Sequence, residues 1–83
     1  MIRVLIVEDQ AILRESLARS VGDQPDMTVV SAIADASEAL GVALKERPDM
    51  ILMDVCTEHD SNGIVAAARI KEQLPEGRVI IMT

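Results

Sequence analysis

The sequence predicts an α/β fold built on a doubly wound parallel sheet, and two observations carry this prediction. Short apolar runs without polar alternation occupy residues 2–7, 50–53 and 79–82, a pattern typical of strands that are covered on both faces. Segments of helical periodicity lie between the runs, so strands and helices alternate along the chain. No internal repeat or interdomain linker is visible. We therefore expect residues 1–83 to form one domain with right-handed crossovers between parallel strands.

The first strand and helix follow from a change of periodicity after residue 10. Residues 2–7 are rich in β-branched side chains, whereas residues 11–21 have a helical period. The apolar residues that can share one face of this helix are Ile12, Leu13, Leu17 and Val21. Either Asp9 or Gln10 is expected to cap its amino end. The segment 22–26 contains Gly and Pro and is predicted to be a loop.

The second strand, residues 28–33, is expected at an edge of the sheet because it is less apolar and contains Ser31. Asp35 precedes Glu38 by three residues, an arrangement typical of a helix start with Asp as the cap. The helix is expected to end near Glu46. Its narrow apolar stripe consists of Ala36, Ala39, Leu40, Ala43 and Leu44.

The third strand, third helix and fourth strand are bounded by similar signals. Pro48 ends the second helix because a proline pushes the residue before it out of helical dihedrals. The third strand ends at Asp54, and Asn62-Gly63 is read as the start of a helix over 64–74. The residues expected to face inward are Ile64, Ala67, Ala68 and Leu74. Pro75-Glu76-Gly77 then turns the chain into the fourth strand.

Composition excludes several classes of protein. The net charge is −6, and the eight Lys and Arg residues are scattered, which argues against a nucleic-acid surface in this segment. The single cysteine, Cys56, excludes an internal disulfide and fits a reducing compartment. No stretch is long enough for a membrane span, and the start does not resemble a signal peptide. A soluble, cytoplasmic chain is expected.

Carboxylates follow two of the predicted strands. If the first and third strands are neighbours, as in the order 2-1-3-4, then Glu8, Asp9 and Asp54 converge at the topological switch point. Carboxylates in one crevice repel, so they take up protons or hold a cation, and oxygen ligands suit Mg²⁺. A carboxylate can also become an aspartyl phosphate. Thr83 follows the fourth strand, where its hydroxyl could reach a phosphoryl oxygen. Each residue alone also has a plainer reading as a turn or helix-start residue.

Together these motifs resemble the receiver domain of response regulators in two-component signalling. The motifs are Val-Glu-Asp-Gln at 7–10, Ile-Leu-Met-Asp at 51–54, Asn62-Gly63, and Val-Ile-Ile-Met-Thr at 79–83. Arg-Val-Leu-Ile-Val-Glu-Asp-Gln at 3–10, followed by Arg-Glu-Ser-Leu-Ala at 14–18, is similar to the sequence of regulators that carry a LuxR-type helix-turn-helix output domain. The family implies a flavodoxin-like fold in the cytoplasm, Mg²⁺ as cofactor and a histidine kinase as partner. Small-molecule phosphodonors and DNA contact through a separate output domain are further implications.

The resemblance assigns a role to each candidate site residue. Asp54 would accept the phosphoryl group, and Asp9 would bind Mg²⁺ directly. Glu8 would act mostly through water, and the backbone carbonyl of Cys56 would be a further metal ligand. The hydroxyl of Thr83 would follow the phosphoryl group. In this reading the domain is a phosphoacceptor rather than an enzyme.

The chain departs from the family pattern in two places. The segment 56–61 lacks the usual Pro and is slightly longer. The family's active-site lysine belongs to a fifth strand, which residues 1–83 do not reach, and Lys45 and Lys71 lie on predicted helices. We therefore expect a domain truncated after its fourth strand, lacking the last helix-strand-helix of the complete fold.

Two alternatives to the phosphoacceptor reading remain, and the expected truncation has one consequence. The chain could be a structural dimerisation module that never receives phosphate. Less favoured is a Mg²⁺-dependent phosphatase with an aspartyl nucleophile, because the second Asp expected two residues after the nucleophile is Cys56. The consequence is self-association, since residues 79–82 would form an exposed edge strand. A homo-oligomer through this strand is expected.

Overall fold

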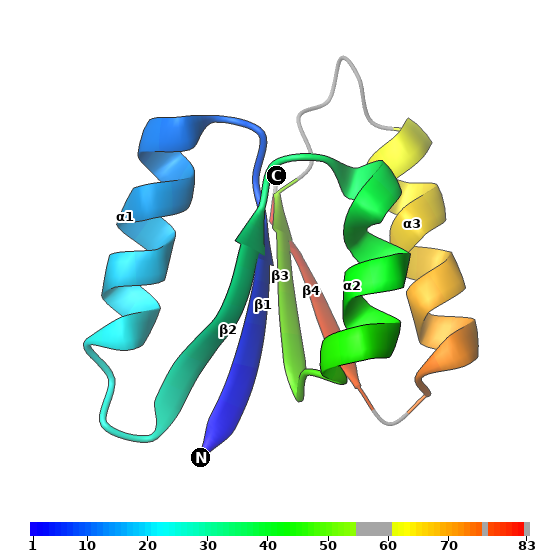
Figure 1. The fold of residues 1–83 in the computed structure, drawn as a ribbon. Helices are drawn as coiled ribbons and strands as arrows, with labels where there is room; N and C mark the ends of the chain where they lie inside the picture. Colours follow the sequence, from blue (N-terminus) through cyan, green and yellow to red (C-terminus); the bar gives the residue numbers. More distant parts are fainter. Residues whose placement is uncertain (55–60, 76, 83) are drawn as a thin grey trace.

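The computed structural model describes residues 1–54, 61–75 and 77–82. Strands and helices alternate along the chain, as predicted (Figure 1). The elements are β1 (Ile2–Val7), α1 (Ala11–Gly22), β2 (Met27–Ile33), the 3-10 helix η1 (Ala36–Glu38), α2 (Ala39–Glu46), β3 (Met50–Asp54), α3 (Ser61–Gln73) and β4 (Arg78–Met82). None of the helices in this part of the chain is long and apolar enough to cross a membrane.

The strands form one parallel sheet in the order β2-β1-β3-β4, which confirms the predicted topology. Helix α1 covers one face of the sheet, and α2 and α3 cover the other (Figure 1). The larger core cluster lies under α2 and α3, where Leu5, Ile51 and Met53 pack against Ala43 and Ile70. The smaller cluster joins α1 to β1. The residues that α2 and α3 bury in the larger cluster include Ala39, Ala43, Ala66 and Ala67.

The two central strands differ in how completely they are covered. Residues 4–7 of β1 are buried on both faces. In β3, Ile51 and Met53 are buried, but Met50 and Leu52 are only half-buried on the α1 face. The prediction that β3 is covered on both faces is therefore right for one face only. A single helix on the other face covers β1 and leaves the surface of β3 partly open.

Several predicted helix details are wrong. Ile12 is 86% exposed, so it does not belong to the inner face of α1. Gln10 occupies the cap position of α1 without a side-chain cap bond. Helix α3 begins at Ser61, so Asn62-Gly63 lies inside the helix. Ala68 is exposed, and among the described side chains of α3 the buried ones are those of Ala66, Ala67 and Ile70. The side chain of Ile64 lies outside the described part.

Two other local predictions are confirmed. Asp35 Oδ1 accepts a hydrogen bond from Ser37 N at 2.9 Å, which caps η1 and lowers the Asp35 pKa. At the end of α2, Arg47 adopts a left-handed conformation with φ 47°. The Arg47 N–H still bonds the Ala43 carbonyl, which is the last helical bond of α2. The left-handed backbone then ends the helix and directs the chain into Pro48. The short link to β3 follows from this reversal.

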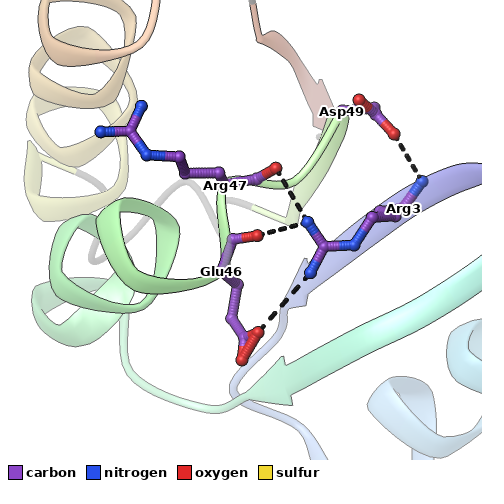
Figure 2. A network of polar contacts seen from close by, with 4 residues as sticks. All are labelled: Arg3, Glu46, Arg47 and Asp49. Carbon is purple, nitrogen blue, oxygen red and sulfur yellow. Dashed lines mark hydrogen bonds and ion pairs between the residues drawn. The ribbon is translucent and has the colours of Figure 1, made fainter.

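A polar network at the amino ends of the strands joins β1 to the α2–β3 link (Figure 2). The Arg3 guanidinium donates to the main-chain carbonyls of Glu46 and Arg47 and pairs with the Glu46 carboxylate at 3.7 Å. Asp49 bridges β1 and β4, since it bonds the main chain of Arg3 and its carbonyl accepts from Arg78 N at 3.2 Å. This network holds the amino end of the sheet opposite the edge that carries the carboxylates.

Candidate functional site

The strand register brings Glu8 and Asp54 to the same edge of the sheet. Val7 of β1 pairs with Met53 of β3. Glu8 directly follows Val7, and Asp54 directly follows Met53 and ends β3. The switch in strand order falls here, because β2 lies on one side of β1 and β3 on the other. Ligands of open parallel sheets bind at such a point, where the loops diverge.

Glu8 is the one charged residue of the described chain that is fully buried, with 1% of its surface exposed. Its Oε1 accepts a hydrogen bond from Gln10 N at 3.3 Å, and its Oε2 has no partner. Burial, together with a carboxyl neighbour in Asp54, raises the pKa of Glu8 to about 7. The negative charge of Asp9 adds to this rise. Without a cation, Glu8 is therefore more readily protonated than an ordinary glutamate.

The other candidate residues are placed unequally. Asp54 is half-buried beside Glu8, whereas Asp9 is exposed on the β1–α1 link. Within residues 1–54, 61–75 and 77–82, no three His, Cys, Asp or Glu side chains are arranged to hold a metal ion together. Cys56 and Thr83 lie outside the described residues. The structure thus places Glu8 beside Asp54. That Glu8, Asp9 and Asp54 bind one metal ion together stays a prediction.

The chemistry of the edge fits Mg²⁺. A buried carboxylate oxygen without a partner, Glu8 Oε2, is costly unless a proton or a cation compensates it. Hard oxygen donors suit Mg²⁺, which retains several waters and needs only one or two carboxylates. Glu8 and Asp54 could supply such oxygens, and the negative charge of Asp9 acts on Glu8.

Sequence reasoning missed a cation at this edge. Arg14 is not among the residues expected on the inner face of α1, but it is half-buried and its Nη1 donates to the Glu8 carbonyl at 2.9 Å. Helical side chains lean toward the amino end of their helix, and this geometry lets Arg14 reach back six residues. That lean is the only sequence signal that could have suggested the contact.

A cavity of about 360 Å³ lies at the opposite end of the sheet. Arg47, Pro48 and Asp49 line one side, and Gln73, Leu74, Pro75 and Gly77 line the other. Gln73 is the last residue of α3, and the other lining residues belong to the links that enter β3 and β4. The cavity is therefore separate from the carboxylate edge, which lies where the strands end.

Comparison with known proteins identifies the family of this fold and edge. Residues 4–83 match the model of the response regulator receiver domain. The chain belongs to this family. As a receiver domain it is 31% identical over 81 residues to the oxygen regulatory protein NreC of Staphylococcus haemolyticus, and 37% identical over 83 residues to the transcriptional regulatory protein LiaR of Bacillus subtilis. It spans 37% and 39% of these two relatives.

Solved structures show the same receiver fold. A LuxR-family two-component response regulator from an Aurantimonas species matches with a TM-score of 0.86 and 31% identity, over 98% of this chain and 57% of that one. The response regulator domain of Thermotoga maritima CheB matches with a TM-score of 0.82 and 38% identity, over 98% and 59%. The order 2-1-3-4 is thus the flavodoxin-like arrangement of receiver domains.

Proposed function

We propose that this receiver domain accepts a phosphoryl group on Asp54. The observation that carries the proposal is the half-buried Asp54 carboxylate beside the buried Glu8, at the switch point of a receiver fold. One oxygen of Asp54 attacks the phosphorus of a donor. The bond from phosphorus to a histidine nitrogen of a kinase, or to the leaving oxygen of a small phosphodonor, breaks as the new P–O bond forms. The product is an aspartyl phosphate.

The chain's own residues prepare this step. A cation at the edge would favour the ionised form of Glu8, because a nearby positive charge lowers the pKa of a carboxyl group. Glu8, Asp9, Asp54 and the carbonyl of Cys56 are proposed to hold Mg²⁺, with Thr83 contacting the transferred group. When bound, Mg²⁺ screens the negative oxygens of the donor. The reaction modifies the protein once, so the domain is a phosphoacceptor and not an enzyme with turnover.

The printed names of the relatives support a wider proposal. They describe regulatory proteins, one of them transcriptional, and the chain spans less than two fifths of their length. We infer that residues 1–83 act in the cytoplasm as the signal-receiving part of a transcriptional response regulator. A histidine kinase is the phosphate donor. DNA contact belongs to an output domain outside this segment, in keeping with the net charge of −6 here.

Self-association is proposed for the 83-residue chain. Strand β4 is an edge of the described sheet, and Ile80 is 42% exposed. Its neighbour in β3, Leu52, is half-buried on the same face. An apolar edge with unpaired backbone groups can pair with a second copy. We propose a homo-oligomer through β4 and this adjoining face. In a longer chain, residues after Thr83 would compete for the same surface.

Mass measurement after incubation with acetyl phosphate and Mg²⁺ tests the phosphoacceptor proposal. The wild type should gain one phosphoryl group, and Asp54→Asn should not. Asp23→Asn, an exposed change at the far end of α1, serves as the matched control and should be modified normally. Continuous phosphate release with turnover would favour the phosphatase alternative. Absence of an adduct would favour the structural dimerisation module.

A further inference from the structure

We propose that Arg14 is a positioning residue that fixes the main chain of Glu8 and Asp9 at the carboxylate edge. The inference rests on the proposed function of that edge. Arg14 is the fourth residue of α1. The residue is half-buried, and its Nη1 reaches the strand end, where it donates to the Glu8 carbonyl at 2.9 Å.

The main chain of Glu8 is held from two sides. Its N–H donates to the Ile33 carbonyl of β2 at 2.9 Å. Strand β2 ends at Ile33, so no further β2 residue continues the ladder opposite the Glu8 carbonyl. Among the described residues, Arg14 is the hydrogen-bond donor to that carbonyl. The Arg14 guanidinium therefore supplies the hydrogen bond that the Glu8 carbonyl would otherwise accept from a continued strand β2.

The link from β1 to α1 has few other restraints. Gln10 caps α1 without a side-chain bond, and the first turn of α1 carries no acidic residue. The bond from Gln10 N to Glu8 Oε1 is long, at 3.3 Å. Asp9 is exposed between these positions. A charged donor that is partly removed from water makes a stronger bond than a neutral one. Among the described residues, the bond from Arg14 is thus the strongest side-chain restraint on the Glu8 carbonyl, where the link to α1 begins.

The direction in which Mg²⁺ affinity changes when Arg14 is replaced distinguishes a positioning role from a direct effect of its charge. Removing a positive charge near a cation site should tighten Mg²⁺ binding, because one source of repulsion is lost. Loss of a positioning contact should weaken Mg²⁺ binding, because the carboxylates are then less well ordered. Weaker binding after removal of a positive charge therefore cannot be a direct charge effect.

The experiment compares Arg14→Gln, Arg14→Lys and Arg19→Gln in the full 83-residue chain. Arg19 is exposed on the last turn of the same helix, so its change removes an equal charge away from the strand end. Amide hydrogen exchange at residues 8–10 is measured without metal, and the Mg²⁺ dissociation constant is measured by titration. Circular dichroism confirms that each variant is folded.

We expect Arg14→Gln to speed exchange at residues 8–10 by about tenfold, which corresponds to loss of one charge-assisted bond. The Mg²⁺ dissociation constant should rise roughly threefold to tenfold. Arg14→Lys should recover part of both changes because it retains a charged donor. Arg19→Gln should match the wild type.

Two results would overturn the positioning role. One is unchanged or tighter Mg²⁺ binding in Arg14→Gln, and the other is equal loss in Arg14→Gln and Arg19→Gln. Neither readout requires phosphorylation. A wild type that binds Mg²⁺ but never gains a phosphoryl group would therefore reject the proposed function and leave the exchange comparison to decide the role of Arg14.

Discussion

Arg3 and Asp49 are bonded to each other twice at the amino ends of β1 and β3. Arg3 N donates to Asp49 Oδ2 at 2.9 Å, and Asp49 N donates to the Arg3 carbonyl at 2.8 Å. At the carboxyl end of the same strand pair, Glu8 and Asp54 lie in the same register as Arg3 and Asp49. The pair of strands is therefore closed by attraction at one end and carries mutually repelling carboxylates at the other.

The first prediction concerns this closure. Asp49→Ala should lower the free energy of unfolding by about 1 kcal/mol, because it removes one side-chain bond to the β1 main chain. Urea denaturation measures the change. Asp26→Ala is the control, since Asp26 is exposed and contributes only its main-chain carbonyl, which accepts from Ile2 N. Equal stability of the two variants would show that the Asp49 side chain contributes nothing.

The second prediction is a pH dependence without metal. The pKa of Glu8 rises from 4.5 to about 7 on folding, so the folded state binds more protons than the unfolded state between these values. Stability from this group is complete below pH 4.5 and is lost as the pH rises through 7, by on the order of 3 kcal/mol. Denaturation in EDTA at pH 5 and pH 8 should show the loss. Glu8→Gln should flatten the difference, and an unchanged slope in that variant would reject Glu8 as its source.

The third prediction is that Mg²⁺ stabilises the protein. A ligand at ten times its dissociation constant, bound only by the folded state, adds about 1.4 kcal/mol. Thermal melting with and without Mg²⁺ should show the shift. Asp54→Asn should raise the melting temperature in metal-free buffer, since it removes one carboxylate beside Glu8. A wild-type melting curve indifferent to Mg²⁺ would remove the metal site from the carboxylate edge.

The fourth prediction contrasts two isoleucines on different helices. Ile70 of α3 is 1% exposed in the main core, and Ile12 of α1 is 86% exposed. Ile70→Ala should cost roughly 2–5 kcal/mol through lost burial and a cavity. Ile12→Ala should change stability by less than about 0.5 kcal/mol. Comparable losses in both variants would mean that Ile12 has an apolar partner in solution.

The fifth prediction tests self-association through β4. Sedimentation of the 83-residue chain at tens of micromolar should show a homo-oligomer. Ile80→Lys should weaken it by placing a charge on the exposed edge. Val65→Lys, at a 49% exposed position on α3, controls for added surface charge. A folded wild-type monomer, unaltered by the Ile80 change, would contradict the proposed interface.

The order of elements is determined by the sequence itself, because its signals are local. Largely apolar runs without polar alternation specify β1 and β3, and breakers specify the links between elements. Asp35 caps as its neighbours predict, and Pro48 keeps Arg47 out of right-handed helical dihedrals, since both effects act over only a few residues. The left-handed conformation of Arg47 itself is not predicted by Pro48. Alternation implies parallel strands with right-handed crossovers. The order 2-1-3-4 was an assumption that the structure confirms, because alternation does not say which face of the sheet each helix covers.

Tertiary structure alone decided which apolar helix residues are buried. Periodicity allowed Ile12 and Ala68 to face inward, yet both are exposed. The direction of a helix face depends on how the helix crosses the sheet and on where it begins, and neither is encoded in a short repeat. Helix α3 begins at Ser61, before the predicted start, and its inner face passes through Ala66, Ala67 and Ile70.

The carboxylate edge shows the same division. The sequence placed Glu8 and Asp54 at strand ends, and topology then made them neighbours. That Glu8 is 1% exposed with one oxygen unpartnered, and that Arg14 bonds its carbonyl, depends on the register of β1 and the position of α1. Burial and hydrogen bonding arise from atoms brought together by long-range packing, so they have no signature in the residues on either side of Glu8.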